Sequence, residues 1–169
     1  MISKTDEEKV EGVMKRVKAN DASAMCFLSN LYHGGLRGLQ QDQERAMELL
    51  TRAADLGHGE AQYNLGVYYY EGGDLKKAKF HYEAAAMKGN EQARCNLGLM
   101  EYDSNKERAF KHFTIAASAG HYRAMNALQK GFDRFFVSRD AIDAILAAYN
   151  NSCVEMRSEA RDAYIKLFM

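Results

Sequence analysis

Proline and tryptophan are absent from this sequence of 169 residues. Without proline, no residue interrupts a helix by removing a backbone donor, so long helices meet no obstacle. Basic and acidic residues balance at 23 each, and the zero net charge provides no strong field for nucleic acid or an anionic membrane. No apolar run approaches the roughly 20 residues that cross a bilayer, and the start of the chain lacks the apolar stretch of a signal peptide. These absences favour a helical protein that binds neither nucleic acid nor membranes.

Cysteine is also scarce, with Cys26, Cys95 and Cys153 far apart in the sequence. No pair has the Cys-x-x-Cys spacing of thiolate metal sites, and an odd number leaves no complete disulfide framework. We therefore expect no intramolecular disulfide and a reducing compartment, the cytoplasm or the nucleus. We also expect no bound metal and no cofactor.

What the sequence does contain is one pattern that recurs four times. Alanines at positions 24, 61, 93 and 124, here called the first marker alanines, each stand four residues before a leucine. Second marker alanines follow at 46, 78, 109 and 141, each four residues before a large apolar residue. The steps between first marker alanines are 37, 32 and 31 residues, the period of helical-hairpin repeats. The pattern predicts an all-α fold, a right-handed αα-superhelix of about four hairpins.

The whole chain, 1–169, is predicted to form one such solenoid. Gly57, Gly89 and Gly120 end three of the units and are expected to take the positive φ angles that turn one hairpin into the next. Asn20 ends the opening helix in the same way, and Thr5 is expected to cap its start. The predicted segments are a capping helix at 5–20, repeats at 21–57, 58–89 and 90–120, a degenerate fourth repeat at 121–156 and a C-terminal capping helix at 158–169.

Segments from both halves of the repeat carry a family resemblance. AQYNLGVYY at 61–69 has the pattern of the first of the two helices in a repeat, here called the first helix. RGLQQD at 37–42 has the pattern of the loop between the first helix and the second. The matching second helices are AMELLTRAADLG at 46–57, AKFHYEAAAMKG at 78–89 and AFKHFTIAASAG at 109–120. Over about residues 21–149 the chain resembles the Sel-one-like repeat (SLR) family, whose units are similar to tetratricopeptide repeats, and it departs from the pattern at Gln129 and Ser152. The resemblance implies an adaptor or scaffold that holds other proteins.

One segment resembles a narrower branch of that family. KTDEEKVEGVMKRVKANDASAM, at 4–25, is similar to protist, particularly diatom, SLR proteins in which it follows a RING-type zinc finger. This resemblance implies an alternative function, the substrate-recognition repeat portion of a ubiquitin ligase. RING cysteines are absent from the sequence, so the ligase chemistry is not assigned to these residues. The coding sequence upstream of residue 1 would discriminate between the two functions.

Histidines and glycines could carry chemistry, but their surroundings favour structural roles. His81 and His112 occupy one position in successive second helices, where a metal site would need a third ligand that the spacing does not supply. His58 and His121 follow closing glycines and are expected, like Asp21, to begin helices. The loop GGLRG at 34–38 lacks the spacing of a phosphate-binding loop, and no nucleophile has an activating context. We therefore expect no catalytic residue and rank a hydrolase or antibiotic-binding activity, known from a cysteine-paired SLR branch, as a second alternative.

The binding surface is predicted from the way that first helices face in tetratricopeptide repeats. Residues two, three, six and nine positions after each first marker alanine would project from the concave face, whereas Tyr32 and Tyr69 would lie in the core. Asn64 and Asn96 could bond a peptide backbone or link neighbouring repeats, and the sequence leaves both open. The predicted function is non-catalytic protein–protein interaction by a monomeric scaffold whose partner is a protein. The predicted partner-binding residues are Phe27, Asn30, Tyr63, Asn64, Val67, Tyr70, Asn96, Leu99 and Tyr102, and the same rule points Cys26, His33 and Cys95 outward.

Overall fold

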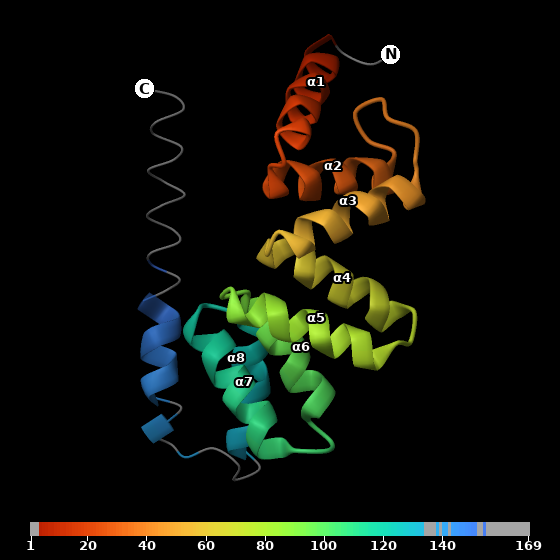
Figure 1. Cartoon of the computed structure of the whole chain (residues 1–169). Helices are drawn as coiled ribbons and strands as arrows, with labels where there is room; N and C mark the ends of the chain where they lie inside the picture. Colours follow the sequence, from red (N-terminus) through yellow and green to blue (C-terminus); the bar gives the residue numbers. More distant parts are fainter. Residues whose placement is uncertain (1–3, 134–137, 139, 142, 152–153, 155–169) are drawn as a thin grey trace. The chain divides into compact units, whose positions relative to one another are not determined.

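The computed structural model describes residues 4–133, 138, 140–141, 143–151 and 154. Every regular element in this part of the chain is an α-helix, which confirms the all-α class. The chain divides into two compact units, Met1–Asn90 and Glu91–Met169. The expected C-terminal capping helix at 158–169 lies outside the described residues. The helices are α1 (Lys4–Lys18), α2 (Ala22–Gly34), α3 (Gln43–Asp55), α4 (Gly59–Glu71), α5 (Leu75–Met87), α6 (Glu91–Glu101), α7 (Lys106–Ser118) and α8 (Tyr122–Asp133) (Figure 1).

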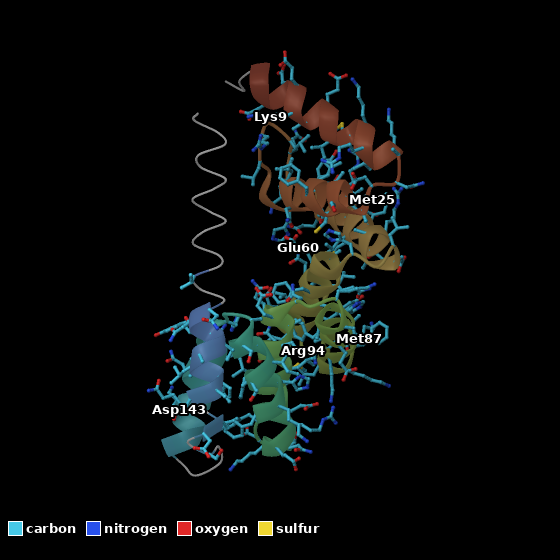
Figure 2. The ribbon with its side chains drawn as sticks, turned by 90° about the vertical axis from the view of Figure 1, so that its left-hand side faces the viewer. Lys9, Met25, Glu60, Met87, Arg94 and Asp143 are labelled. Carbon is cyan, nitrogen blue, oxygen red and sulfur yellow. The ribbon has the colours of Figure 1, made fainter. Side chains whose placement is uncertain are left out.

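In the first unit, consecutive helices pack as pairs (Figure 1). The largest contacts join α2 with α3 and α4 with α5, and smaller contacts join α1 with α2 and α3 with α4. The marker alanines Ala24, Ala46, Ala61 and Ala78 are at most 3% exposed. Their single methyl groups let the helix backbones approach, while larger side chains such as Met25, which is fully buried and labelled in Figure 2, fill the remaining space.

The second unit is built on the same pattern. Its main contacts join α6 with α7 and α7 with α8. The marker alanines Ala93, Ala109 and Ala124 are fully buried, and so are the large side chains of Phe113 and Leu128. Residues 140–141 and 143–151 are also helical. The buried Ile145 belongs to the same hydrophobic core as Phe113. Within the described ranges of both units, no helix is long and apolar enough to span a membrane.

A glycine opposite an aromatic ring lets the two helices of a hairpin approach closely. Gly66 of α4 faces Tyr82 of α5, and a Cβ atom added to Gly66 would lie 2.5 Å from the ring carbon Cδ1. Gly98 of α6 faces Phe113 of α7 in the same way, with 2.5 Å between an added Cβ and the ring carbon Cε1. Real Cβ atoms do not come so near a ring carbon, so each ring occupies the space that a side chain on the glycine would need. The Leu-Gly pair of the first helix therefore has a packing function.

The ends of the helices follow their local sequence signals, with one exception. Gly57, Gly89 and Gly120 have φ angles of 79°, 87° and 91°, which confirms the expected left-handed closing residues. Asn20, with a φ of 58°, ends the turn after α1 as predicted. The predicted N-cap role of Thr5 is wrong, because α1 already begins at Lys4 and Thr5 lies inside the helix. Helix ends vary by a residue or two when no side chain fixes them.

Three polar residues cap first helices as the sequence predicts. The side chains of Asp21, His58 and His121 each accept a hydrogen bond from the backbone N–H three residues further on, at 3.0, 3.3 and 3.3 Å. Each thereby satisfies one of the backbone donors that a helix leaves open at its start. A histidine can accept such a bond through Nδ1 only while this nitrogen is unprotonated. The cap formed by His121 is therefore sensitive to acid.

We expect acidification to destabilise the protein partly through His121. Burial lowers the pKa of His121, Glu91 raises it and Arg123 lowers it, with a net decrease from the ordinary value of 6.5. The unfolded chain therefore binds the proton more readily than the folded one. The stability that neutral His121 contributes is complete at pH values above its pKa in the unfolded chain, and it is lost as the pH falls through its lower pKa in the folded protein. His121→Asn keeps an acceptor without the titrating ring, so its stability should depend less on pH. Urea unfolding at about pH 7.5 and about pH 5.5 compares the two proteins, and equal losses would contradict the capping account.

Candidate functional site

A groove in the first unit lies between α2, α3 and α4, and we call it the first groove. Its volume is about 280 Å³. Three predicted partner-binding residues line it, Asn30 from α2 and Asn64 and Val67 from α4. The residues that line it are Ser29, Asn30, His33, Gln43, Ala46, Met47, Leu50, Asn64, Val67, Tyr68 and Glu71.

Hydrogen bonds organise the polar side of the first groove. His33 Nδ1 lies 2.9 Å from Oε1 of Gln43, which ties α2 to the start of α3. Gln41 Nε2 donates to the carbonyl oxygen of His33 at 3.0 Å and fixes the loop before α3. Asn64 Nδ2 donates to the sulfur of Cys26 at 3.8 Å, a weak bond between α4 and α2. Asn64 thus links neighbouring first helices and lines the groove at once, so the two roles left open by the sequence are compatible at this position.

The second unit contains a groove between α6, α7 and α8, which we call the second groove. Its volume is about 410 Å³. Two predicted binding residues, Leu99 of α6 and Tyr102 directly after this helix, form one wall. The Tyr102 ring packs against those of Phe110 and Phe113, with centroids 6.0 and 6.5 Å apart, so its orientation is fixed by the core. The residues that line the second groove are Leu99, Tyr102, Phe113, Arg123, Asn126, Ala127 and Lys130.

The two grooves occupy the same positions of the repeat. The sixth residue after each first marker alanine lines a groove in all four cases. The ninth residue, His33 in the first groove and Tyr102 in the second, lies on the wall formed by the earlier of the two repeats. The third residue, Asn64 in the first groove and Ala127 in the second, lies on the wall formed by the first helix of the later repeat. The sixth-position residues are Asn30, Val67, Leu99 and Lys130. The same repeat positions therefore form a groove in each of the two units.

The other predicted binding residues lie outside the two grooves. Phe27 is 43% exposed, with the guanidinium of Arg37 5.9 Å from its ring centroid, and Tyr70 is 51% exposed. Tyr63 is partly buried, with its ring centroid 6.0 Å from that of Tyr82. Asn96 is partly buried on α6. The structure thus brings five of the nine predicted residues into grooves, and whether any of the nine binds a partner stays a prediction.

In the first and third repeats the second position after the first marker alanine does not project from the surface, contrary to the prediction for the concave face. Cys26 is 2% and Cys95 1% exposed. Because α2 packs against both α1 and α3, its buried arc is wider than one stripe and includes this position. Burial raises the pKa of the Cys26 thiol to about 11, with Glu60 raising and Asn64 lowering it. A thiol with this pKa is a poor nucleophile near neutral pH.

A buried acidic residue was missed by the sequence analysis. Glu101, at the end of α6, is only 5% exposed. Its Oε1 lies 3.2 Å from Nη2 of Arg108, and its Oε2 lies 3.7 Å from Nε2 of His112. The sequence did contain a signal for this burial, because Glu101 stands at the repeat position where the two preceding units carry Tyr32 and Tyr69. His112 therefore packs beside a carboxylate. In the described part of the chain, no group of three or more His, Cys, Asp or Glu side chains is arranged to hold a metal ion.

Tandem helical hairpins, with a groove beside one pair of first helices in each unit, define a helical-repeat protein. The family model of the Sel1 repeat matches residues 22–58, 59–90 and 92–121. The chain belongs to the Sel1 repeat family. Solved structures agree: a protective antigen of uropathogenic Escherichia coli that displays an SLR fold has a TM-score of 0.73 at 25% identity, over 84% of this chain and 33% of that one. A Sel1 repeat protein from Oxalobacter formigenes has a TM-score of 0.67 at 27% identity, over 72% of this chain and 98% of that one.

Curated relatives are much longer than this chain. An F-box protein of Arabidopsis thaliana is 30% identical over 100 residues, which is 57% of this chain and 28% of that protein. Chitin synthase regulatory factor 3 of Schizosaccharomyces pombe is 32% identical over 140 residues, which is 76% of this chain and 15% of that protein. The chain thus spans less than a third of these two relatives.

Proposed function

We propose that this chain is a non-catalytic adaptor that binds a segment of a protein partner along its first-helix grooves. The observation that carries the proposal is the recurrence of the groove at the same repeat positions in both units. A repeat that forms one groove per pair of first helices offers a binding area that grows with the number of repeats. Extended and helical segments are the ligands that such grooves accept.

The composition of the grooves supports recognition of a peptide. Leu50 and Met47 give the first groove an apolar floor, while Asn30 and Asn64 bring carboxamides with donors and acceptors to its walls. In the second groove, Tyr102 offers an aromatic surface whose position the core fixes. A rigid apolar or aromatic surface rimmed by polar groups resembles the centre of protein interfaces, where most binding free energy is concentrated. Little ordering would be needed on binding, which favours affinity.

The relatives support a binding role over a reaction. The two relatives described above are named as an F-box protein and a chitin synthase regulatory factor. Each of these proteins is several times longer than this chain. A repeat module that forms part of a longer protein fits the task of holding a partner for that protein. A reducing compartment, cytoplasm or nucleus, belongs to the same proposal, because Cys26 and Cys95 are buried as free thiols.

The ligase alternative rests on the resemblance of residues 4–25. In the structure this segment contains α1 and the start of α2, and Val10 of α1 is buried and joins the core of the first unit. The apolar residues of α1 thus have a packing function against α2 within the first unit, which does not depend on a zinc finger. A ubiquitin-transfer assay on the natural full-length protein tests this alternative, and transfer activity would favour it over a simple adaptor.

Substitutions in the first groove test the proposed function. A partner is first identified by proximity labelling, and its affinity for the purified chain is then measured by calorimetry. Asn30→Arg combined with Val67→Arg places two long cations in the groove and should weaken the partner by about tenfold or more. Melting temperature should stay close to that of the wild type, because Asn30 is exposed and Val67 is only partly buried.

The matched control places the same residues on a second helix. Phe80 and Met87 of α5 are 65% and 78% exposed and lie outside both grooves. Phe80→Arg with Met87→Arg adds the same charge and should leave the affinity unchanged. If this control weakens the partner while the groove variant does not, the binding surface lies on the second helices and the proposal is wrong.

A further inference from the structure

The two grooves differ in the sign of their charge. Among the described residues that line the first groove, Glu71 is the one acidic residue, and none is lysine or arginine. Arg123 and Lys130 line the second groove, and none of its described lining residues is acidic. Both side chains are exposed, and among the described residues neither forms an ion pair. Two cations are therefore available to a ligand of the second groove.

The two cations stand on one face of α8. They are seven residues apart, close to two helical turns, which places their Cα atoms about 10.5 Å from each other along the helix. The exposed carboxamide of Asn126 and the small side chain of Ala127 lie between them. The opposite wall is apolar, with Leu99, which is 47% exposed, and the ring of Tyr102. A ligand would thus meet two positive charges along one side and an apolar wall along the other.

The electrostatic field of Arg123 reaches the neighbouring helix. Burial raises the pKa of the Cys95 thiol on α6, and the positive charge of Arg123 opposes this increase. Arg123 and Leu99 of α6 line the same groove, so the cation also acts on whatever lies between the two helices. With a net charge of zero for the whole chain, this is a local feature and does not predict general attraction of polyanions.

We infer that the second groove selects an acidic peptide segment, with two carboxylates three positions apart and apolar side chains between them. In a polyproline II segment, which has three residues per turn, side chains three positions apart lie on the same side about 9 Å from each other, close to the separation of the two cations. The inference rests on the proposed function and names the chemistry of the partner. Each exposed ion pair changes an affinity only by about 1.5- to 5-fold, so the apolar contact with Leu99 and Tyr102 must supply the rest. The charges then decide which segment binds and how fast it associates.

The test uses five short peptides, each acetylated, amidated and labelled with a fluorophore. The first has the core Glu-Leu-Phe-Glu, flanked by glycine and serine. In the second and third, glutamine and lysine replace both glutamates, in the fourth serine replaces leucine and phenylalanine, and in the fifth the two glutamates are adjacent. Fluorescence anisotropy with the intact chain should give the tightest binding for the first peptide, weakened by salt because its ion pairs are exposed. Equal binding of the acidic and the glutamine peptide would overturn the inference, and so would equal binding of the serine peptide.

Charge reversal in the protein locates the site. Arg123→Glu with Lys130→Glu should weaken the first peptide by about tenfold and make the lysine peptide the preferred one. Lys9→Glu with Lys76→Glu is the matched control, because both lysines are exposed in the first unit and the net charge changes equally (Lys9 is labelled in Figure 2). If the control weakens binding as much, the effect is one of net charge and the inference is wrong. A single-stranded oligonucleotide that binds more tightly than the acidic peptide would also overturn it.

These results are separable from the test of the proposed function. A chain that binds its partner through the first groove but shows no preference for acidic peptides would refute only the inference. A partner that is insensitive to the first-groove variant would count against the proposed surface, whatever the peptides do.

Discussion

Phe113→Ala is expected to lower the free energy of unfolding by about 3–5 kcal/mol, the range for truncating a large buried aromatic side chain. The ring is fully buried and lies at the centre of the second unit. It packs against Phe110, with centroids 6.1 Å apart, and it fills the space left open by Gly98. Removing it leaves a cavity between α6 and α7 that the rigid neighbouring backbones cannot close. Most of the cost comes from lost apolar contact and from that cavity.

Ile115→Ala on the same helix is the control for this prediction. Ile115 is 49% exposed, so truncating it should change stability by less than about 0.5–1 kcal/mol. Urea unfolding of both variants, followed by circular dichroism, measures the difference. Similar losses for the two variants would show that the second unit does not pack around Phe113.

Gly66→Ala is expected to lower the free energy of unfolding by about 1–3 kcal/mol, although alanine is intrinsically the better helix former. The added methyl group would lie 2.5 Å from the Tyr82 ring, which is itself buried and has no room to withdraw. Either the two helices of the hairpin move apart or the ring leaves its preferred orientation. Both movements disturb a core packed to high density.

Gly12→Ala is the matched control, since Gly12 also lies within a helix, α1, but an added Cβ meets nothing within 4 Å. There the substitution should stabilise the protein by about 0.5–1 kcal/mol, because glycine loses more backbone freedom on folding than alanine. The two substitutions are thus predicted to have opposite signs in the same thermal or chemical unfolding experiment. A stabilising Gly66→Ala would refute the close contact between α4 and α5.

Features that depend on neighbouring residues in the sequence were predicted well. The steps between marker alanines gave the hairpins, because helix pairs can approach only where small residues recur at helical spacing. Gly57 and Asn20 were assigned to left-handed helix ends because few residues tolerate positive φ. Asp21 and His121 were assigned to helix starts, where a short polar side chain can reach an open backbone donor.

Features that depend on which helix packs against which face were predicted less well. Cys26 was expected at the surface but is buried, since α2 packs against helices on more than one side. Gln129 was correctly read as a departure from the glycine pattern, but the structure reveals that Gly131, two residues later, lies against Phe110 instead. Glu101 was missed because a repeat pattern gives the position of a residue and not the partners that neutralise it. The grooves themselves required the positions of three helices at once.

The central claim is that this protein binds through its first helices, and hydrogen exchange measured with and without its protein partner tests it most directly. Exchange of backbone amides reports local opening and reveals which helices a bound partner protects. We predict increased protection in one or more of the first helices, α2, α4, α6 and α8, and little change in α5 and α7. Protection confined to the second helices, such as residues 76–88 in and directly after α5, with the first helices unchanged, would contradict the claim.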